Sequence, residues 1–154
     1  MSSQREQRLA RYRTGFGDVQ DALRGAMDAE LDRDQGQGDW TARQVAHHLA
    51  DSEAMAYIRL RRLIAEDQPV IQAYNEPEWA RRLHYDRPIE ASLAVLKAVR
   101  EASLQLLAGL TPDEWRRAGT HTESGRYSVE DWLRIYSEHS HEHADQIRRA
   151  LASG

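Results

Sequence analysis

The stretch that decides the fold reads Ser128-Val-Glu-Asp-Trp-Leu-Arg-Ile-Tyr-Ser-Glu-His-Ser-His-Glu-His-Ala-Asp-Gln-Ile-Arg-Arg-Ala-Leu151. Its apolar residues recur at spacings of three and four, which predicts one amphipathic helix over residues 128–151. Ser128 can cap the N-terminus of this helix, and Asp131 stands in the first turn, where an acidic side chain favours the helix start. The inward stripe comprises Val129, Trp132, Leu133, Tyr136, Ser140, Ile147 and Leu151.

Three histidines lie near the middle of this helix. His139 and His143 fall inside the apolar stripe, whereas His141 falls outside it. Side chains four residues apart on a helix lie one above the other, so the imidazoles of His139 and His143 can converge on one point inside the fold. Two imidazoles that converge in a core are either satisfied by hydrogen bonds or hold a metal ion.

Upstream of residue 128, the same periodicity predicts three more long helices. Residues 5–31 form the first, in which Gly15 and Gly17 weaken the helix and mark a close approach to a neighbour. The second opens at Thr41, with Gln44 completing a capping box, and runs to Glu66. Near its end, Arg59, Arg61 and Arg62 are interpreted as a solvated face. The third runs over residues 88–109.

The connections between the long helices carry shorter elements. Asn75, Pro77 and Glu78 are typical of a helix start and predict a short helix over residues 76–84. A further turn is predicted from Thr111 to Arg117, followed by a loop over residues 118–127. No segment alternates apolar and polar residues over the length of a strand. The chain is therefore expected to be all-α: a single four-helix-bundle domain over residues 1–154, in which the long crossover permits an up-down-down-up order.

Composition restricts the function. The chain has 154 residues and a formal net charge of -4, without the basic patch that nucleic-acid binding needs. It has no apolar run long enough to cross a bilayer and a polar N-terminus, so a cytoplasmic address without membrane binding is expected. Because the chain contains no cysteine, a metal has to be held by His, Asp, Glu or water, and no protein thiol can act as nucleophile.

A third histidine lies on the predicted helix over residues 41–66. His48 falls within the inward stripe of that helix, and His47 lies at its edge. Three neutral imidazoles with open positions match a catalytic zinc site and also suit nickel or iron. The alternative is that each imidazole is hydrogen-bonded to an Asp or Tyr neighbour. The third inward histidine strengthens the metal interpretation, because every buried imidazole needs a partner of its own.

Four stretches together resemble one family, the DinB/YfiT-like superfamily of bacterial helical-bundle metalloproteins, and its YfiT-like branch in particular. They are residues 40–53, where a His stands three residues before Asp51; residues 68–76 with Trp79-Ala80; His121-Thr-Glu-Ser-Gly125; and Tyr136-x-x-His139-x-x-x-His143-x-x-Gln146-Ile147. Two positions depart from the pattern of the branch. Thr122 replaces a usual Pro, and His141 stands where many members have another residue.

The resemblance implies a divalent metal, zinc or nickel first, held by His48, His139 and His143 with open positions completed by water. It implies an enzyme acting on a small-molecule substrate, with self-association as a homodimer. Family members include low-molecular-weight thiol transferases, a thiol-dependent isomerase and proposed hydrolases. The leading expectation is transfer of a low-molecular-weight thiol cosubstrate to an electrophile. The alternatives are a hydrolase that uses water bound by the metal, and a stress-related bundle without enzymatic activity.

Three further residues are candidates for a part in the chemistry. Asp51 can orient an imidazole from three residues beyond His48. His121 and Glu123, in the predicted loop before the last helix, can act as acid, base or substrate contact. Each has a plainer interpretation: ordinary helix polarity for Asp51, and a helix cap for the loop residues.

Overall fold

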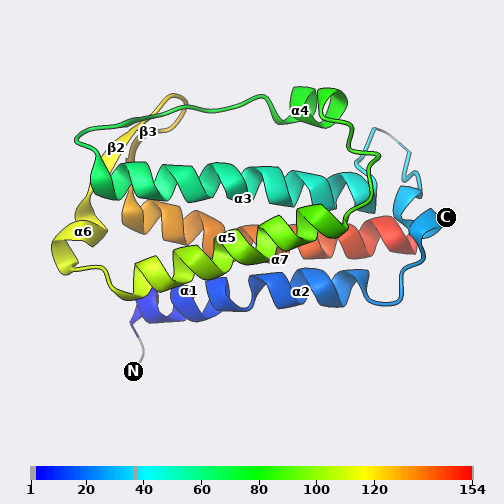
Figure 1. Cartoon of the computed structure of the whole chain (residues 1–154), viewed down its shortest axis with the longest axis horizontal. Coiled ribbons are helices and arrows are strands. Elements are labelled where there is room, and N and C mark those ends of the chain that lie inside the picture. Colours follow the sequence, from blue (N-terminus) through cyan, green and yellow to red (C-terminus); the bar gives the residue numbers. More distant parts are fainter. Residues whose placement is uncertain (1–2, 37, 154) are drawn as a thin grey trace.

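Four long helical segments lie side by side in a computed structural model that describes residues 3–36 and 38–153 (Figure 1). The first segment is split into α1 (Gln4–Arg13) and α2 (Gly15–Leu23); the others are α3 (Ala42–Ala65), α5 (Glu90–Ala108) and α7 (Val129–Ala152). α3 and α5 run opposite to α1, α2 and α7, so the predicted up-down-down-up four-helix bundle is confirmed. Residues 1, 2, 37 and 154 of the predicted domain lie outside the described part.

The starts of the long helices agree with their capping signals. In α3 the Thr41 hydroxyl accepts from the Gln44 amide, and the Gln44 side chain accepts from the Thr41 amide. In α7 Ser128 and Asp131 form the equivalent reciprocal pair. These contacts satisfy backbone amides that a helix start otherwise leaves without partners. Because the contacts are local, the sequence alone predicted where both helices begin.

The prediction of one helix over residues 5–31 is wrong. The helix breaks at Thr14, α2 ends at Leu23, and a short 3-10 helix, η1 (Asp28–Asp32), follows. The reason for the break is that side chains take the carbonyls that would continue the helix. The Arg11 carbonyl accepts from the Thr14 hydroxyl at 3.1 Å and lies 2.9 Å from Nε2 of His141, and the Tyr12 carbonyl accepts from Nη2 of Arg100 at 2.6 Å.

The two glycines beside this break differ. A Cβ on Gly15 would lie 2.5 Å from Nη2 of Arg100 and 3.0 Å from Cβ of Ser140, whereas a Cβ on Gly17 would meet nothing within 4 Å. The predicted close approach is therefore confirmed at Gly15 and wrong at Gly17. Only at Gly15 does the absence of a side chain let the first helical segment pack against its neighbours.

The long connections hold the remaining elements: β1 (Val70–Ile71), α4 (Glu76–Arg82), α6 (Pro112–Arg116), β2 (Ala118–His121) and β3 (Gly125–Ser128). The predicted loop over residues 118–127 is instead a hairpin, because β2 and β3 pair antiparallel, and β1 joins β2 in parallel with Val70 opposite Thr120. Strands of two to four residues are too short to show alternation in the sequence. A Cβ at Gly119 would overlap the Pro69 carbonyl, so this glycine permits the pairing.

The interior of the bundle is mostly apolar, and buried polar contacts join its helices. Trp132 is fully buried and donates from Nε1 to the Ala56 carbonyl at 2.9 Å, which joins α7 to α3. Glu53 and Arg100, both buried, form an ion pair at 3.1 Å between α3 and α5. Among the described residues, no helix is both long and apolar enough to cross a membrane.

Candidate metal centre

Three imidazoles meet between α3 and α7. His48 comes from α3, and His139 and His143 come from adjacent turns of α7. One ring nitrogen of each lies within 4.8 Å of the others. The ring centroids are separated by 4.5 Å for His139 and His143, 4.8 Å for His48 and His143, and 5.8 Å for His48 and His139. The structure thus brings together the three histidines that the sequence placed on inward faces of two helices.

The hydrogen bonding of this cluster leaves ring nitrogens free. Nδ1 of His143 donates to Oε1 of Gln146 at 2.7 Å, which leaves its Nε2 with a lone pair. Nδ1 of His139 is buried, and neither this atom nor the His48 ring has a hydrogen-bond partner among the described residues. Trp40 packs against the His48 ring at 4.8 Å and covers it on one side. Unpartnered imidazole nitrogens that face one another fit a divalent ion.

Burial keeps the cluster uncharged. Desolvation lowers the pKa of His48 from 6.5 to about 3, with a further contribution from the neighbouring His143. Burial also lowers the pKa of His143, and it lowers the pKa of His139 well below its usual value. At neutral pH all three imidazoles are therefore neutral, which is the protonation state that binds a metal.

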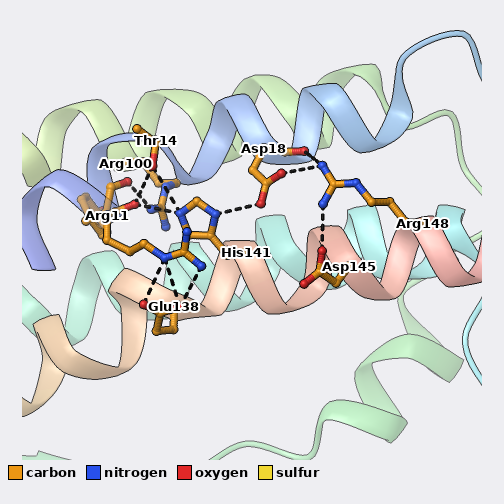
Figure 2. A network of polar contacts seen from close by, with 9 residues as sticks. Arg11, Thr14, Asp18, Arg100, Glu138, His141, Asp145 and Arg148 are labelled. Atoms are coloured by element: carbon orange, nitrogen blue, oxygen red, sulfur yellow. Dashed lines mark hydrogen bonds and ion pairs between the residues drawn. The ribbon is translucent and has the colours of Figure 1, made fainter.

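The two neighbouring histidines are bonded within the protein. On α3, Nδ1 of His47 lies 2.7 Å from the Ser92 hydroxyl and Nε2 lies 2.7 Å from the Arg87 carbonyl. On α7, His141 points away from the cluster toward the first helical segment (Figure 2), where Nδ1 meets Asp18 at 2.8 Å. Its Nε2 meets the Arg11 carbonyl at 2.9 Å. Both rings have partners on each nitrogen and serve to join helices.

Among the described residues, the candidates Asp51, His121 and Glu123 form their hydrogen bonds with groups other than the three imidazoles. The Asp51 carboxylate accepts from the Tyr85 hydroxyl at 2.6 Å, so the residue that orients an imidazole is Gln146 and not Asp51. Nδ1 of His121 accepts from the amides of Glu123 and Ser124 at 3.1 and 3.3 Å, which closes the turn of the hairpin. Glu123 contributes its backbone to that turn, and its carboxylate is exposed.

The prediction of a solvated face near the end of α3 is wrong for Arg59. Arg59 does not belong to a solvated face, because its Nη1 donates to the Tyr136 hydroxyl at 3.3 Å and the Tyr136 ring lies 5.5 Å from the His139 ring. The signal that could have identified it is the spacing of eleven residues from His48. Eleven residues make about three helical turns, so Arg59 shares the inward face of α3.

The fold and the cluster together define a class of protein: a four-helix bundle in which two antiparallel helices present three imidazoles to one point. A family model described as the DinB superfamily matches residues 11–147 of the chain. The protein belongs to this superfamily, as the resemblance predicted.

Relatives and solved structures agree with this assignment. The chain is 43% identical over 118 residues to an Oceanobacillus iheyensis protein named "Putative metal-dependent hydrolase", covering 77% of this chain and 69% of that protein. A Halalkalibacterium halodurans protein of the same name is 32% identical over 84% of this chain and 77% of its own length. YfiT from Bacillus subtilis, described as a probable metal-dependent hydrolase, superposes with a TM-score of 0.88 at 28% identity, covering 100% of this chain and 91% of that chain.

Proposed function

We propose that this protein is a metal-dependent enzyme that transfers a low-molecular-weight thiol to an electrophilic small molecule. The observation that carries the proposal is the group of three neutral imidazoles, which each place one ring nitrogen within 4.8 Å of the others; the group includes no sulfur or carboxylate ligand. When bound there, a divalent ion such as zinc or nickel supplies a Lewis-acid position that lowers the pKa of a thiol or of water. The chain has no cysteine, so the thiol comes from a separate molecule.

The side chains of the protein have defined parts in this proposal. His48, His139 and His143 hold the ion without neutralising its charge, because their pKa values lie below neutral pH. Gln146 fixes the tautomer and the orientation of His143. Trp40 shields the His48 ring from water on one side. These contacts give a preorganised binding point for an anionic nucleophile.

A second candidate function is hydrolysis with water as the nucleophile, and the names of the relatives favour it. The candidate carboxylate for proton transfer in such a reaction is Glu76, an exposed residue in the first turn of α4. Its negative charge, like that of Glu142, opposes the lowering of the His143 pKa by burial. A third candidate, a metal-binding bundle without catalysis, is retained as an outcome of the test.

The test begins with elemental analysis of protein purified without a histidine tag. The metal-loaded protein is then assayed with electrophiles in the presence and absence of bacillithiol, mycothiol or glutathione. Turnover that needs the thiol supports the proposal, turnover without a thiol supports hydrolysis, and no turnover supports the bundle without catalysis. The cytoplasmic address, the single domain and the homodimer stay predictions; sedimentation as a monomer at high concentration would contradict the homodimer.

A further inference from the structure

The guanidinium of Arg59 lies beside the three imidazoles and contacts Tyr136, which packs on one of them. It lies on the same face of α3 as His48, three helical turns further on. Its Nη1 donates to the hydroxyl of Tyr136, and the Tyr136 ring stands edge-on to the His139 ring with centroids 5.5 Å apart. A single aromatic side chain therefore separates the guanidinium from the cluster.

The positive charge of Arg59 has no carboxylate partner among the described residues. Its hydrogen-bond acceptors are the Tyr136 hydroxyl at 3.3 Å and the Gln72 carbonyl at 2.7 Å, and its Nε is buried without an acceptor. The buried arginines elsewhere are paired: Arg100 with Glu53, and Arg43 with Asp28 and Asp32. A partly buried, unpaired guanidinium is costly, which is typical of a group that meets its counter-charge on a ligand.

The segments around Arg59 surround its guanidinium with aromatic and polar groups. The Tyr74 ring lies 5.9 Å from the guanidinium carbon and packs on Trp79, so the crossover covers one side. The hydroxyl of Tyr74 is itself buried and has no hydrogen-bond partner in the part of the chain that the structure describes. On the hairpin, the pKa of His121 is lowered by burial and then by the charge of Arg59, which places this ring within reach of the same charge.

We infer that Arg59 recognises a carboxylate on the small molecule that binds at the three imidazoles. A guanidinium presents a planar fork of donors that matches a carboxylate, and water is partly excluded here. The ligand class is then a small molecule with a metal-seeking atom at one end and a carboxylate at the other. This inference deepens the proposed function, with the carboxylate on the thiol or on the electrophile.

The test compares two thiols by titration calorimetry on metal-loaded protein. Mercaptosuccinate carries carboxylates, and 3-mercapto-1,2-propanediol carries hydroxyls in their place. The wild type is expected to bind mercaptosuccinate about tenfold or more tightly, because hydrogen bonds to charged groups contribute about 1.5–3 kcal/mol. Arg59→Met is expected to abolish that preference and leave the affinity for the neutral thiol unchanged.

A matched control is available two residues along α3. Arg61 also lacks a carboxylate partner among the described residues, but it faces Tyr57 and the Ser103 hydroxyl. Arg61→Met removes the same charge and is expected to keep the preference for mercaptosuccinate. Arg59→Lys keeps the charge without the planar fork and should retain part of the preference; it also replaces Arg59→Met if that variant does not fold. Circular dichroism and metal content verify each variant.

A succinate titration separates this inference from the proposed function. If 3-mercapto-1,2-propanediol does not bind and no thiol reacts, yet succinate and mercaptosuccinate bind the wild type equally and do not bind Arg59→Met, thiol transfer is wrong and carboxylate recognition stands. If both proteins bind mercaptosuccinate and succinate equally, or if the wild type prefers neither carboxylate, the role inferred for Arg59 is overturned. If Arg61→Met loses the preference as fully as Arg59→Met, the effect is one of general charge and the inference also fails.

Discussion

The two faces of α7 carry histidines only two residues apart, yet the structure gives them different tasks. His141 faces α1 and α2, where Asp18 and the Arg11 carbonyl occupy both of its ring nitrogens (Figure 2). His139 and His143 face α3, where the third imidazole of the cluster also needs a partner. What distinguishes a structural histidine from a candidate ligand is therefore the supply of acceptors opposite it, since buried polar groups need partners.

The same contrast recurs within α3. His47 is satisfied by Ser92 and by the carbonyl of Arg87. Its neighbour His48, rotated by about 100° around the helix, meets aromatic rings and the other two imidazoles. The histidines therefore form two sets. The joining set, His47 and His141, is hydrogen-bonded to other helices and connections; the available set comprises His48, His139 and His143. The two sets can be compared by mutation.

The largest effect is expected from removing a member of the available set. His48→Ala, His139→Ala and His143→Ala should each abolish stoichiometric binding of a divalent ion, because two imidazoles cannot replace three. Elemental analysis and titration of the chelator-treated protein measure this. The matched controls are His47→Ala and His141→Ala, which should keep the metal. Full retention of metal in both His48→Ala and His143→Ala would exclude this site.

The second largest effect is expected from pH, through protonation of His48. The folded pKa of His48 is about 3 against 6.5 without burial, so the unfolded chain binds a proton that the folded chain excludes. In chelator-treated protein, this difference in proton binding has no effect above pH 6.5. As the pH falls from 6.5 toward 3, it lowers the free energy of unfolding progressively, by at most about 5 kcal/mol. Urea unfolding between pH 7 and pH 4 should show the loss, and His48→Asn should show a shallower slope.

Removing a joining histidine should cost stability and leave the metal bound. His141→Ala removes one partner each from Asp18, which keeps Arg148, and from the Arg11 carbonyl, which keeps the Thr14 hydroxyl; the free energy of unfolding should fall by about 1–3 kcal/mol. Urea unfolding measures this change, with elemental analysis in parallel. Loss of the metal with an unchanged free energy of unfolding would contradict the assignment of His141 as a structural residue.

The smallest effect is expected from the side chain that orients a ligand. Gln146→Ala removes the acceptor from Nδ1 of His143 and frees the ring to rotate. Metal affinity should fall roughly 10- to 100-fold, as is usual for such partners. Competition against a chelator provides the measurement, and Asp51→Ala is the control, because Asp51 bonds to Tyr85. An equal loss in both variants would contradict the assignment to Gln146.

The parts of the fold that local sequence predicted well are those that local contacts hold. Thr41 with Gln44 and Ser128 with Asp131 form caps within three residues of one another, so both helix starts could be identified without knowledge of any neighbour. The convergence of His139 with His143 follows from the helical period alone. Its meeting with His48 required the bundle topology that the inward stripes and the long crossover predicted.

The features that were missed depend on contacts between distant segments. The break at Thr14 arises because Arg100 and His141 reach across to carbonyls of the first helical segment. The hairpin of residues 118–128 is supported by β1, which α4, α5 and α6 separate from it in the sequence. The inward turn of Arg59 depends on Tyr136 of α7. None of these partners is visible in a local pattern.

By itself, the sequence determined where α3 and α7 begin and which histidines lie on their inward faces, because helical periodicity and capping are local properties of the chain. The tertiary structure alone decided which imidazoles are satisfied, where the first helix breaks and which groups accept hydrogen bonds from Arg59. Those outcomes depend on hydrogen-bond partners that lie tens of residues away and come within reach only when the helices pack.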